Sequence, residues 1–544
     1  MWGKKLSANW KKSEKWWHGS IVYHIYPRSY YDANDDGIGD LKGITEKLDY
    51  LAGKPDSLGV NAIWLSPFYP SPMADMGYDV CDYQNVDPTF GNLEDFDVLV
   101  EESHRRGIRV FIDFVPNHTS DQHSWFKESR SSKDNPYRDW YIWRPAREDG
   151  SLPNNWLSVF GGSVWQFDKE TNEYYLHTFM KQQPDLNWDN PKVREAMKDN
   201  MRFWLARGVD GFRIDAVSWL SKDPQLRDDP LNPMYHQDED HYLELVHNFS
   251  CEGPKLFDYL NEMVDVCAEF GNRFMITEAY PDVPGEISHY LNYYEKLHHN
   301  LCAPFNFECI SFPWDALSYR GFIDKFQESI LPGQPPIYVM GNHDKPRLAT
   351  RLGRPAARTA AMLLLTLPGI PFIYYGDELG MNNVKLDDNH ADAKDSSHEV
   401  TRRYVARTPM QWSNDKNAGF SKEKPWLPPS ADYKEYNVQA ESTDKASFFY
   451  LYKKLIEFRK ESPALRFGTY RSIDLSSDVF GFVRELNMER FTVVLNFSDQ
   501  EQEVHSKALK GSVVFSTYLD EEFHGEVKDK IKLRPNEGVV ISVF

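Results

Sequence analysis

The sequence predicts an α/β protein built on a (β/α)8 barrel, with one inserted domain and a small all-β domain at the end of the chain. Short apolar runs recur along the sequence and close on polar residues. Segments with helical spacing lie between them, and the pattern changes late in the chain to alternating strands. At 544 residues, 41% of them hydrophobic, the chain is long enough for a barrel and further domains.

The apolar runs predict parallel strands at 61–67, 108–118, 209–216, 273–280 and 336–344. Segments 92–107 and 190–208 have the spacing of amphipathic helices. In the second segment Val193, Met197, Met201 and Trp204 recur at helical intervals, and Gly208 can end the helix in a left-handed conformation. In barrels of this kind the chemistry lies at the carboxyl ends of the strands, where the polar residues of each run occur.

Two regions break the alternation. Residues 119–186 are rich in aromatic residues and turn formers and show no convincing helical repeat, which predicts an inserted domain B after the third strand. After the helical segment 448–462, alternating strands predict a C-terminal β-sandwich, domain C, at 466–544. The barrel, domain A, is then formed by 1–118 and 187–465.

The net charge limits the class of partner, and the cysteine content indicates the compartment. Lys plus Arg number 62 and Asp plus Glu 82, for a formal charge of −20, which disfavours nucleic acid and anionic membranes. Five cysteines without metal-ligand spacing are typical of a reduced, cytoplasmic protein. No signal peptide or membrane span is expected. We expect a small-molecule partner and a monomer or homodimer.

Arg213 and Asp215 lie two positions apart in a predicted buried strand, so they point to the same face. The barrel brings Asp75 to Tyr78, His118, Glu278 and the pair His343 and Asp344 to the same rim. Carboxylates with separate roles are what glycoside cleavage requires, because one attacks the sugar and another protonates the leaving oxygen. Taken alone, Arg213 and Asp215 suit a buried structural ion pair equally well.

Six motifs occur in an order that resembles glycoside hydrolase family 13, the α-amylase superfamily. They are DFVPNH (113–118), QPDLNW (183–188), GFRIDAV (211–217), ITEAY (276–280), GNHD (341–344) and GIPFIYYGDELG (369–380). The resemblance implies a barrel, a domain B after strand three and a C-terminal β-sandwich. It implies Asp215 as nucleophile, Glu278 as general acid/base and Asp344 as the third carboxylate. It also implies three sugar contacts: His118, Arg213 and His343.

Two further motifs, DMGYD (75–79) and RTPMQW (407–412), resemble the oligo-1,6-glucosidase and α-glucosidase branch, most closely the bacterial-type α-glucosidases. By that resemblance Asp75 and Arg407 close the pocket around a terminal glucose and Tyr78 stacks on it. The aromatic walls would be Phe160 and Phe179. This implies a retaining, exo-acting enzyme whose partner is a small-molecule carbohydrate.

The branch tends to have Val after the nucleophile in α-1,6-specific enzymes and Ala or Thr in α-1,4-specific ones. Ala216 therefore favours α-1,4 substrates such as maltose. An α-glucosyltransferase or isomerase acting on sucrose or trehalose and an oligo-1,6-glucosidase remain alternatives, because they use the same glucosyl intermediate. A non-enzymatic binding subunit is disfavoured, because every catalytic carboxylate is present.

The segment DANDDGIGD (32–40) places oxygen-bearing groups at alternating positions, as in the first half of an EF-hand loop. These groups are the side chains of Asp32, Asn34, Asp36 and Asp40 and the carbonyl of Ile38. The glutamate that ends a full EF-hand loop is missing, because Gly43 occupies its position. A solvated acidic turn that binds no cation is therefore the alternative. The resemblance to the same branch favours a structural Ca²⁺ or Mg²⁺. No organic cofactor is expected.

Overall fold

The computed structural model describes residues 15–281, 285–386, 403–520 and 525–543. Residues 1–14 of the predicted barrel segment 1–118 lie outside them. Eight parallel strands close into a barrel in the order β1-β11-β10-β9-β8-β7-β3-β2, which confirms the predicted (β/α)8 fold. Their bounds are β1 Val22–Ile25, β2 Ala62–Leu65, β3 Arg109–Phe114, β7 Gly211–Ile214, β8 Phe274–Thr277, β9 Cys302–Asn306, β10 Ile337–Val339 and β11 Ile370–Tyr374.

The five predicted runs contain β2, β3, β7, β8 and β10. Strands β1, β9 and β11 were not predicted as strands. Pro304 lies inside β9 and Pro371 inside β11, and a proline within an apolar run argues against a central strand because it cannot donate to the sheet. The barrel overrides this local signal by pairing both strands in parallel with β10.

The two predicted helices are confirmed. Asn92 caps α3 in a capping box with Asp95, and the apolar positions predicted for α5 are buried in it. Gly208 follows α5 with φ 96°, a left-handed conformation that favours glycine. The longer helices are α3 Leu93–Arg105, α5 Pro191–Ala206, α6 Leu256–Glu269, α7 Ile287–Lys296, α9 Ala316–Ser329, α11 Arg354–Thr366 and α14 Phe448–Glu461. The shorter ones are α1 Leu41–Glu46, α2 Leu48–Leu51, α4 Ser124–Ser131, α8 Glu308–Ser311, α10 Leu348–Leu352, α13 Val438–Glu441 and α15 Pro463–Phe467. Within the described ranges, no helix has the length and apolarity that a bilayer crossing requires.

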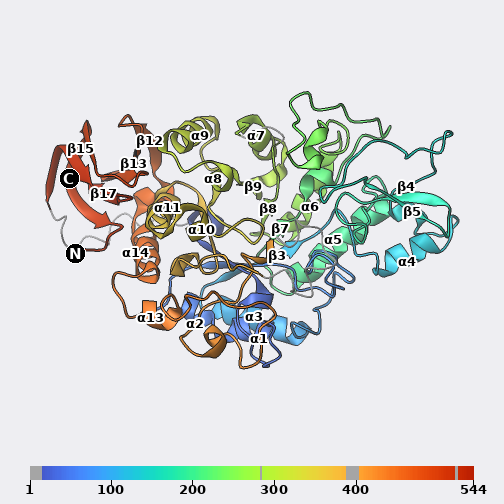
Figure 1. Ribbon diagram of the computed structural model, residues 1–544, viewed down its shortest axis with the longest axis horizontal. Coiled ribbons are helices and arrows are strands. Elements are labelled where there is room, and N and C mark those ends of the chain that lie inside the picture. The colour runs from blue at the N-terminus through green and yellow to red at the C-terminus, as the bar shows by residue number, and fades with distance from the viewer. Residues whose placement is uncertain (1–14, 282–284, 387–402, 521–524, 544) are drawn as a thin grey trace.

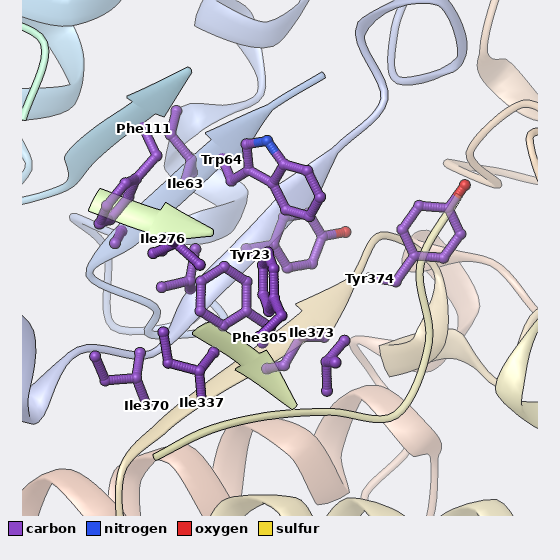
Figure 2. Close-up of a cluster of buried hydrophobic side chains, with 14 of the residues drawn as sticks. Tyr23, Ile63, Trp64, Phe111, Ile276, Phe305, Ile337, Ile370, Ile373 and Tyr374 are labelled. Atoms are coloured by element: carbon purple, nitrogen blue, oxygen red, sulfur yellow. The ribbon is translucent and has the colours of Figure 1, made fainter. Parts of the chain in front are cut away.

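Large side chains fill the barrel interior (Figure 2). Trp64, Phe305 and Phe372 meet there, with ring centroids 5.6 Å apart for Trp64 and Phe305 and 4.8 Å for Phe305 and Phe372. At the amino ends of the strands Trp17 stacks on Phe274 at 4.8 Å. The interior is thus a packed core, which leaves the carboxyl ends of the strands for a binding site.

The insertion between β3 and α5 forms a small domain of its own at the end of the molecule opposite the C-terminal sheet (Figure 1). Its three strands, β4 Trp143–Arg144, β5 Trp165–Asp168 and β6 Glu173–Leu176, pair antiparallel in the order β4-β6-β5. The domain also contains the helix α4, although its sequence shows no convincing helical repeat. Helix α4 is only eight residues long, too short for a helical repeat to be recognised.

The C-terminal strands form an antiparallel sheet in the order β12-β13-β14-β17-β15-β16, which confirms the all-β domain. Among the described residues these six strands make one continuous sheet, not the two separate sheets that a sandwich implies. Strand β15 carries two register shifts, and side chains of five strands share one buried cluster, so the sheet curves around it. The bounds are β12 Thr469–Ile473, β13 Val479–Leu486, β14 Glu489–Asn496, β15 Gln502–Ser516, β16 Glu526–Leu533 and β17 Gly538–Ser542.

Candidate active site

The guanidinium of Arg213 lies at the centre of a buried group of carboxylates. Its Nη1 donates to Asp113 Oδ1 at 2.8 Å and to Asp215 Oδ1 at 2.6 Å. Its Nη2 lies 2.8 Å from Glu278 Oε1. One cation therefore holds the two carboxylates that follow strands β7 and β8 side by side. Asp113, on β3, was not singled out from the sequence, although it opens the DFVPNH motif.

The backbone after β7 and β8 fixes where these carboxylates point. The amide of Asp215 donates to the Phe114 carbonyl, and that of Glu278 donates to the Ile214 carbonyl, both at 2.9 Å. Ala216 then turns into the left-handed region, with φ 50° and ψ 41°. Its amide donates to Glu278 Oε2 at 3.0 Å, so the turn after one carboxylate orients the other.

The carboxylates outnumber the positive charge beside them. Burial raises the pKa of Asp215 well above its ordinary value, and Glu278 and Asp113 add to this rise against the lowering effect of Arg213. Burial likewise raises the pKa of Asp113 to about 6, with Arg213 opposing. Burial and the neighbouring carboxylates therefore favour proton uptake by Asp215 and Asp113, against the charge of Arg213. Adjacent acid and carboxylate groups that exchange a proton are what acid–base catalysis requires.

A second ionised group surrounds Asp344, which follows β10. Its Oδ1 lies 2.9 Å from Arg407 Nη2 and 3.4 Å from Arg403 Nη1. Burial opposes its ionisation, yet His343, Arg403 and Arg407 hold the pKa of Asp344 well below its usual range. Burial also lowers the pKa of His343 itself well below its ordinary value, against the opposing effect of Asp344.

Asp75 and His118 meet through Gln183. The Gln183 amide nitrogen donates to Asp75 Oδ2 at 3.0 Å and lies 3.1 Å from His118 Nε2. Asp75 Oδ1 is buried without a hydrogen-bond partner and lies 4.0 Å from Arg403 Nη1. Burial lowers the pKa of His118 to about 4, so it is neutral. Gln183 was missed as a site residue, although it opens the QPDLNW motif.

Aromatic side chains complete the site. Tyr78 stacks on His343 at 5.4 Å, and its hydroxyl donates to Asp113 Oδ2 at 3.0 Å and lies 2.7 Å from His343 Nε2. Phe179 lies 5.1 Å from the His118 ring and 5.9 Å from Phe160.

These residues surround a cavity of about 960 Å³. Of the predicted catalytic and sugar-binding residues, those that line it are Asp75, Tyr78, His118, Phe160, Phe179, Asp215, Glu278, His343 and Asp344. Arg213 and Arg407 lie behind this lining. Arg407 donates to the His343 carbonyl and to Asp344. Arg403, four residues before the RTPMQW motif, lines the cavity instead, with its guanidinium 5.0 Å from the Phe160 ring centre.

The predicted cation loop is held by its own hydrogen bonds. Asp32 accepts from the amides of Asp35 and Gly37, both at 2.8 Å, and Asp40 caps α1 by accepting from Gly43 at 2.7 Å. Among the described residues, no three carboxylates of the loop have oxygens within 4.8 Å of one another. The hard oxygen donors of Asp32, Asn34, Asp36, Ile38 and Asp40 suit Ca²⁺ or Mg²⁺ by their chemistry.

A closed barrel with carboxylates and a guanidinium at one rim is typical of hydrolytic barrel enzymes, and the comparisons agree. Residues 24–468 match the family of α-amylase catalytic domains. The oligo-1,6-glucosidase of Parageobacillus thermoglucosidasius is 38% identical, over 97% of this chain and 99% of the relative. The α-glucosidase of Apis mellifera is 37% identical, over 99% of this chain and 95% of the relative. The chain therefore belongs to the α-amylase family of glycoside hydrolases.

Solved structures extend this likeness to the whole fold. The α-glucosyl transfer enzyme XgtA superposes with a TM-score of 0.90 at 36% identity, over 98% of this chain and 100% of that one. The trehalulose synthase MutB of Pseudomonas mesoacidophila MX-45 superposes with a TM-score of 0.86 at 36% identity, over 98% of this chain and 100% of that one. The family thus supplies this architecture both to relatives named as hydrolases and to enzymes named for transfer or synthesis.

Proposed function

We propose that the protein is a retaining, exo-acting α-glucosidase that releases α-glucose from the non-reducing end of short oligosaccharides. The observation that carries this proposal is the Arg213 guanidinium, which holds Asp215 and Glu278 side by side at the wall of the cavity. Two carboxyl groups that share one cation are close enough to act on the same glycosidic bond. Relatives named α-glucosidase and oligo-1,6-glucosidase support the same substrate class.

In the first step Asp215 attacks the anomeric carbon as Glu278 gives its proton to the leaving oxygen. The glucosyl ester on Asp215 then reacts with water, whose proton passes to Glu278. Arg213 favours the ionised form of Asp215, because a guanidinium in direct contact stabilises the carboxylate. Of Asp113, Asp215 and Glu278, the mechanism requires Glu278 to donate the proton.

The polar end of the cavity supports removal of a single terminal glucose. Asp75, Asp344 and Arg403 lie around it and are linked through ion-pair distances of 3.4 and 4.0 Å. The unpartnered oxygen of Asp75 is a hydrogen-bond acceptor for an outer sugar hydroxyl. A longer glucan would have to pass through these charged groups, so cleavage in the middle of a chain is disfavoured.

For linkage we propose a preference for α-1,4 over α-1,6 bonds. Ala216 lines the cavity next to Asp215, and a methyl side chain leaves room beside the leaving group. A difference of this size discriminates by about 1 to 3 kcal/mol.

Transfer of the glucosyl group to a sugar is the second candidate. The structures of the α-glucosyl transfer enzyme and the trehalulose synthase favour it, because both share this fold over nearly the whole chain. Water and a sugar hydroxyl compete for the same ester on Asp215, so hydrolysis and transfer differ only in the acceptor.

The test is a panel of maltose, isomaltose, sucrose, trehalose and starch, with products resolved by chromatography and the anomer of the first glucose followed by NMR. We expect α-glucose from maltose, a lower rate on isomaltose and little from starch. The Asp215→Asn variant should lose activity by several orders of magnitude. Release of β-glucose, or full activity of this variant, would contradict the mechanism. Isomaltose cleaved much faster than maltose would contradict the linkage preference.

We also propose that the loop 32–40 binds a structural Ca²⁺ or Mg²⁺. Its side-chain and carbonyl oxygens would hold the ion and brace the segment after β1, away from the reacting groups. Metal analysis after dialysis and thermal unfolding with and without EDTA test this. We expect bound metal and a lower melting temperature in EDTA. A chelated protein that is inactive but melts at the same temperature would contradict a structural role.

A further inference from the structure

A cluster of two histidines and one carboxylate lies at the rim of the barrel opposite the cavity. It is formed by Asp265 on α6 and by His298 and His299, which belong to the 3₁₀ turn His298–Asn300 before β9. Because this turn leads into a strand of the parallel barrel, it lies at the amino ends of the strands. The catalytic carboxylates follow their strands and lie at the other end. The mechanism proposed above makes no use of this cluster.

The possible ligand atoms of the cluster converge. Asp265 Oδ1 lies 3.0 Å from His299 Nε2 and 3.6 Å from His298 Nδ1. All three atoms lie within 4.8 Å of one another, and in the part of the chain that the structure describes no other three His, Cys, Asp or Glu residues meet this condition. A tetrahedral Zn²⁺ with ligands at about 2.0 to 2.1 Å holds them about 3.3 Å apart, between the two distances found here.

The turn that carries the two histidines is fixed to its surroundings on both sides. Asn261, one helical turn before Asp265 on α6, accepts from the His298 amide at 2.8 Å and donates to the Lys296 carbonyl at 3.0 Å. From the other side the Lys15 ammonium donates to the His299 carbonyl at 3.2 Å. Ligands that are already held in position lose little conformational freedom when an ion binds.

The same turn decides where the two rings point. Successive side chains of an extended chain point to opposite faces. His299 instead adopts a left-handed conformation, with φ 62° and ψ −3°, and Asn300 follows with φ 52°. Both imidazole rings, with centroids 5.9 Å apart, therefore reach Asp265. Left-handed backbone is unfavourable for residues other than glycine, and it persists where the surrounding structure imposes it.

The donor atoms select the class of cation. Two imidazole nitrogens and one carboxylate oxygen suit Zn²⁺, whereas Ca²⁺ and Mg²⁺ prefer oxygen ligands alone. The three side chains are each about half exposed, so an ion can enter from solvent and a water molecule can fill the fourth position. The formal charge of −20 on the chain favours binding of a cation.

We propose that Asp265, His298 and His299 form a Zn²⁺ site that joins α6 to the turn before β9. In the metal-free protein the His299 Nε2 proton lies between this nitrogen and Asp265 Oδ1. Zn²⁺ takes the place of that proton, which leaves the neutral ring protonated on Nδ1. The site lies away from the reacting groups, so its role is structural, and the proposal is independent of the proposed function.

The experiment measures Zn²⁺ binding to the full chain after treatment with EDTA and dialysis. Ca²⁺ is kept at a fixed millimolar concentration to occupy oxygen-rich sites, and Zn²⁺ is titrated in a calorimeter. We expect one equivalent that binds at least ten-fold more weakly in Asp265→Asn and in His299→Asn, because loss of a direct ligand should cost at least the roughly 10- to 100-fold lost with an outer partner. Asparagine tolerates the left-handed backbone of position 299. Equal stoichiometry and affinity in all three proteins overturns the proposal.

Co²⁺, which binds to the same kinds of donor, reports the geometry of the site. The wild type should show the intense visible absorption of four-coordinate Co²⁺, and Zn²⁺ should displace it. Both variants should lack this absorption. A wild type without it, or variants that retain it, would contradict the proposed ligands.

His505→Asn is the matched control. His505 is exposed and its Nε2 lies 3.0 Å from Glu503, but among the described residues it belongs to no group of three such ligands. The control should bind Zn²⁺ as the wild type does. Zn²⁺ should also raise the melting temperature of the wild type and of the control, and leave that of Asp265→Asn and His299→Asn unchanged. An equal rise in all four proteins would place the bound ion elsewhere and overturn the proposal.

Discussion

Replacing Arg407 by lysine tests how the second charged group is held together. The Arg407 side chain is fully buried, and its guanidinium donates to the His343 carbonyl at 2.8 Å, to Asp344 at 2.9 Å and to the Tyr26 hydroxyl at 3.4 Å. A lysine keeps the charge but replaces the planar fork with a single ammonium that cannot span all three acceptors.

The expected loss follows from these contacts. If the ammonium stays with Asp344, the His343 carbonyl and the Tyr26 hydroxyl lose a buried partner, at about 1 to 2 kcal/mol each. Arg407→Lys should therefore lower the free energy of unfolding by about 3 kcal/mol. Because His343 and Asp344 both line the cavity, their displacement should also lower kcat/KM for maltose, by about 100-fold for a shift near 1 Å.

Unfolding in guanidinium chloride measures the change in stability, and steady-state kinetics on maltose measure the change in kcat/KM. Arg147→Lys is the control, because Arg147 makes the same kinds of bond, to the Pro153 carbonyl and to Asp228, but is 45% exposed. It should change stability by less than about 0.5 kcal/mol. If Arg407→Lys unfolds at the same denaturant concentration as the wild type, the three hydrogen bonds do not hold this group and the reasoning is refuted.

Three further changes have defined outcomes. Ala216→Val places a branched side chain on a backbone with φ 50°, which should lower the free energy of unfolding by about 1 kcal/mol. It should also lower the ratio of kcat/KM for maltose to kcat/KM for isomaltose about ten-fold. An unchanged ratio would exclude this position as the linkage determinant. Burial raises the pKa of Glu441 from 4.5 to about 8, so the native protein keeps a proton that the unfolded chain releases, and stability falls between these pH values as pH rises. Glu441→Gln should remove that decline, so its melting temperature should gain on the wild type from pH 5 to pH 8; parallel pH profiles would contradict it. Gly369 has φ 97°, and Gly369→Ala would bring a methyl group to 2.0 Å from the Pro336 carbonyl oxygen. This variant should lower the free energy of unfolding by about 2 to 4 kcal/mol. A variant as stable as the wild type in denaturant would contradict the close approach.

Local patterns were sufficient for the features whose signal is carried by neighbouring residues. Three predicted features depend only on nearby residues, and the structure confirms them. They are the helical repeat of apolar residues in α5, the end of that helix at the left-handed Gly208 and the apolar runs of five barrel strands. The predictions failed where the barrel itself supplies the stabilisation. Strands β9 and β11 each contain a proline, which by itself argues against a central strand.

By itself the sequence determined which chemical groups the protein carries at its strand ends, because Asp215, Glu278 and Asp344 all come within a few residues of the end of an apolar run. Only the tertiary structure decided which groups face each other. Arg213 takes Asp113 as a partner 100 positions away, and Arg403 lines the cavity where Arg407 was expected. The physical reason is that barrel closure joins residues distant in the chain, and a hydrogen bond across that distance leaves no periodicity in the sequence.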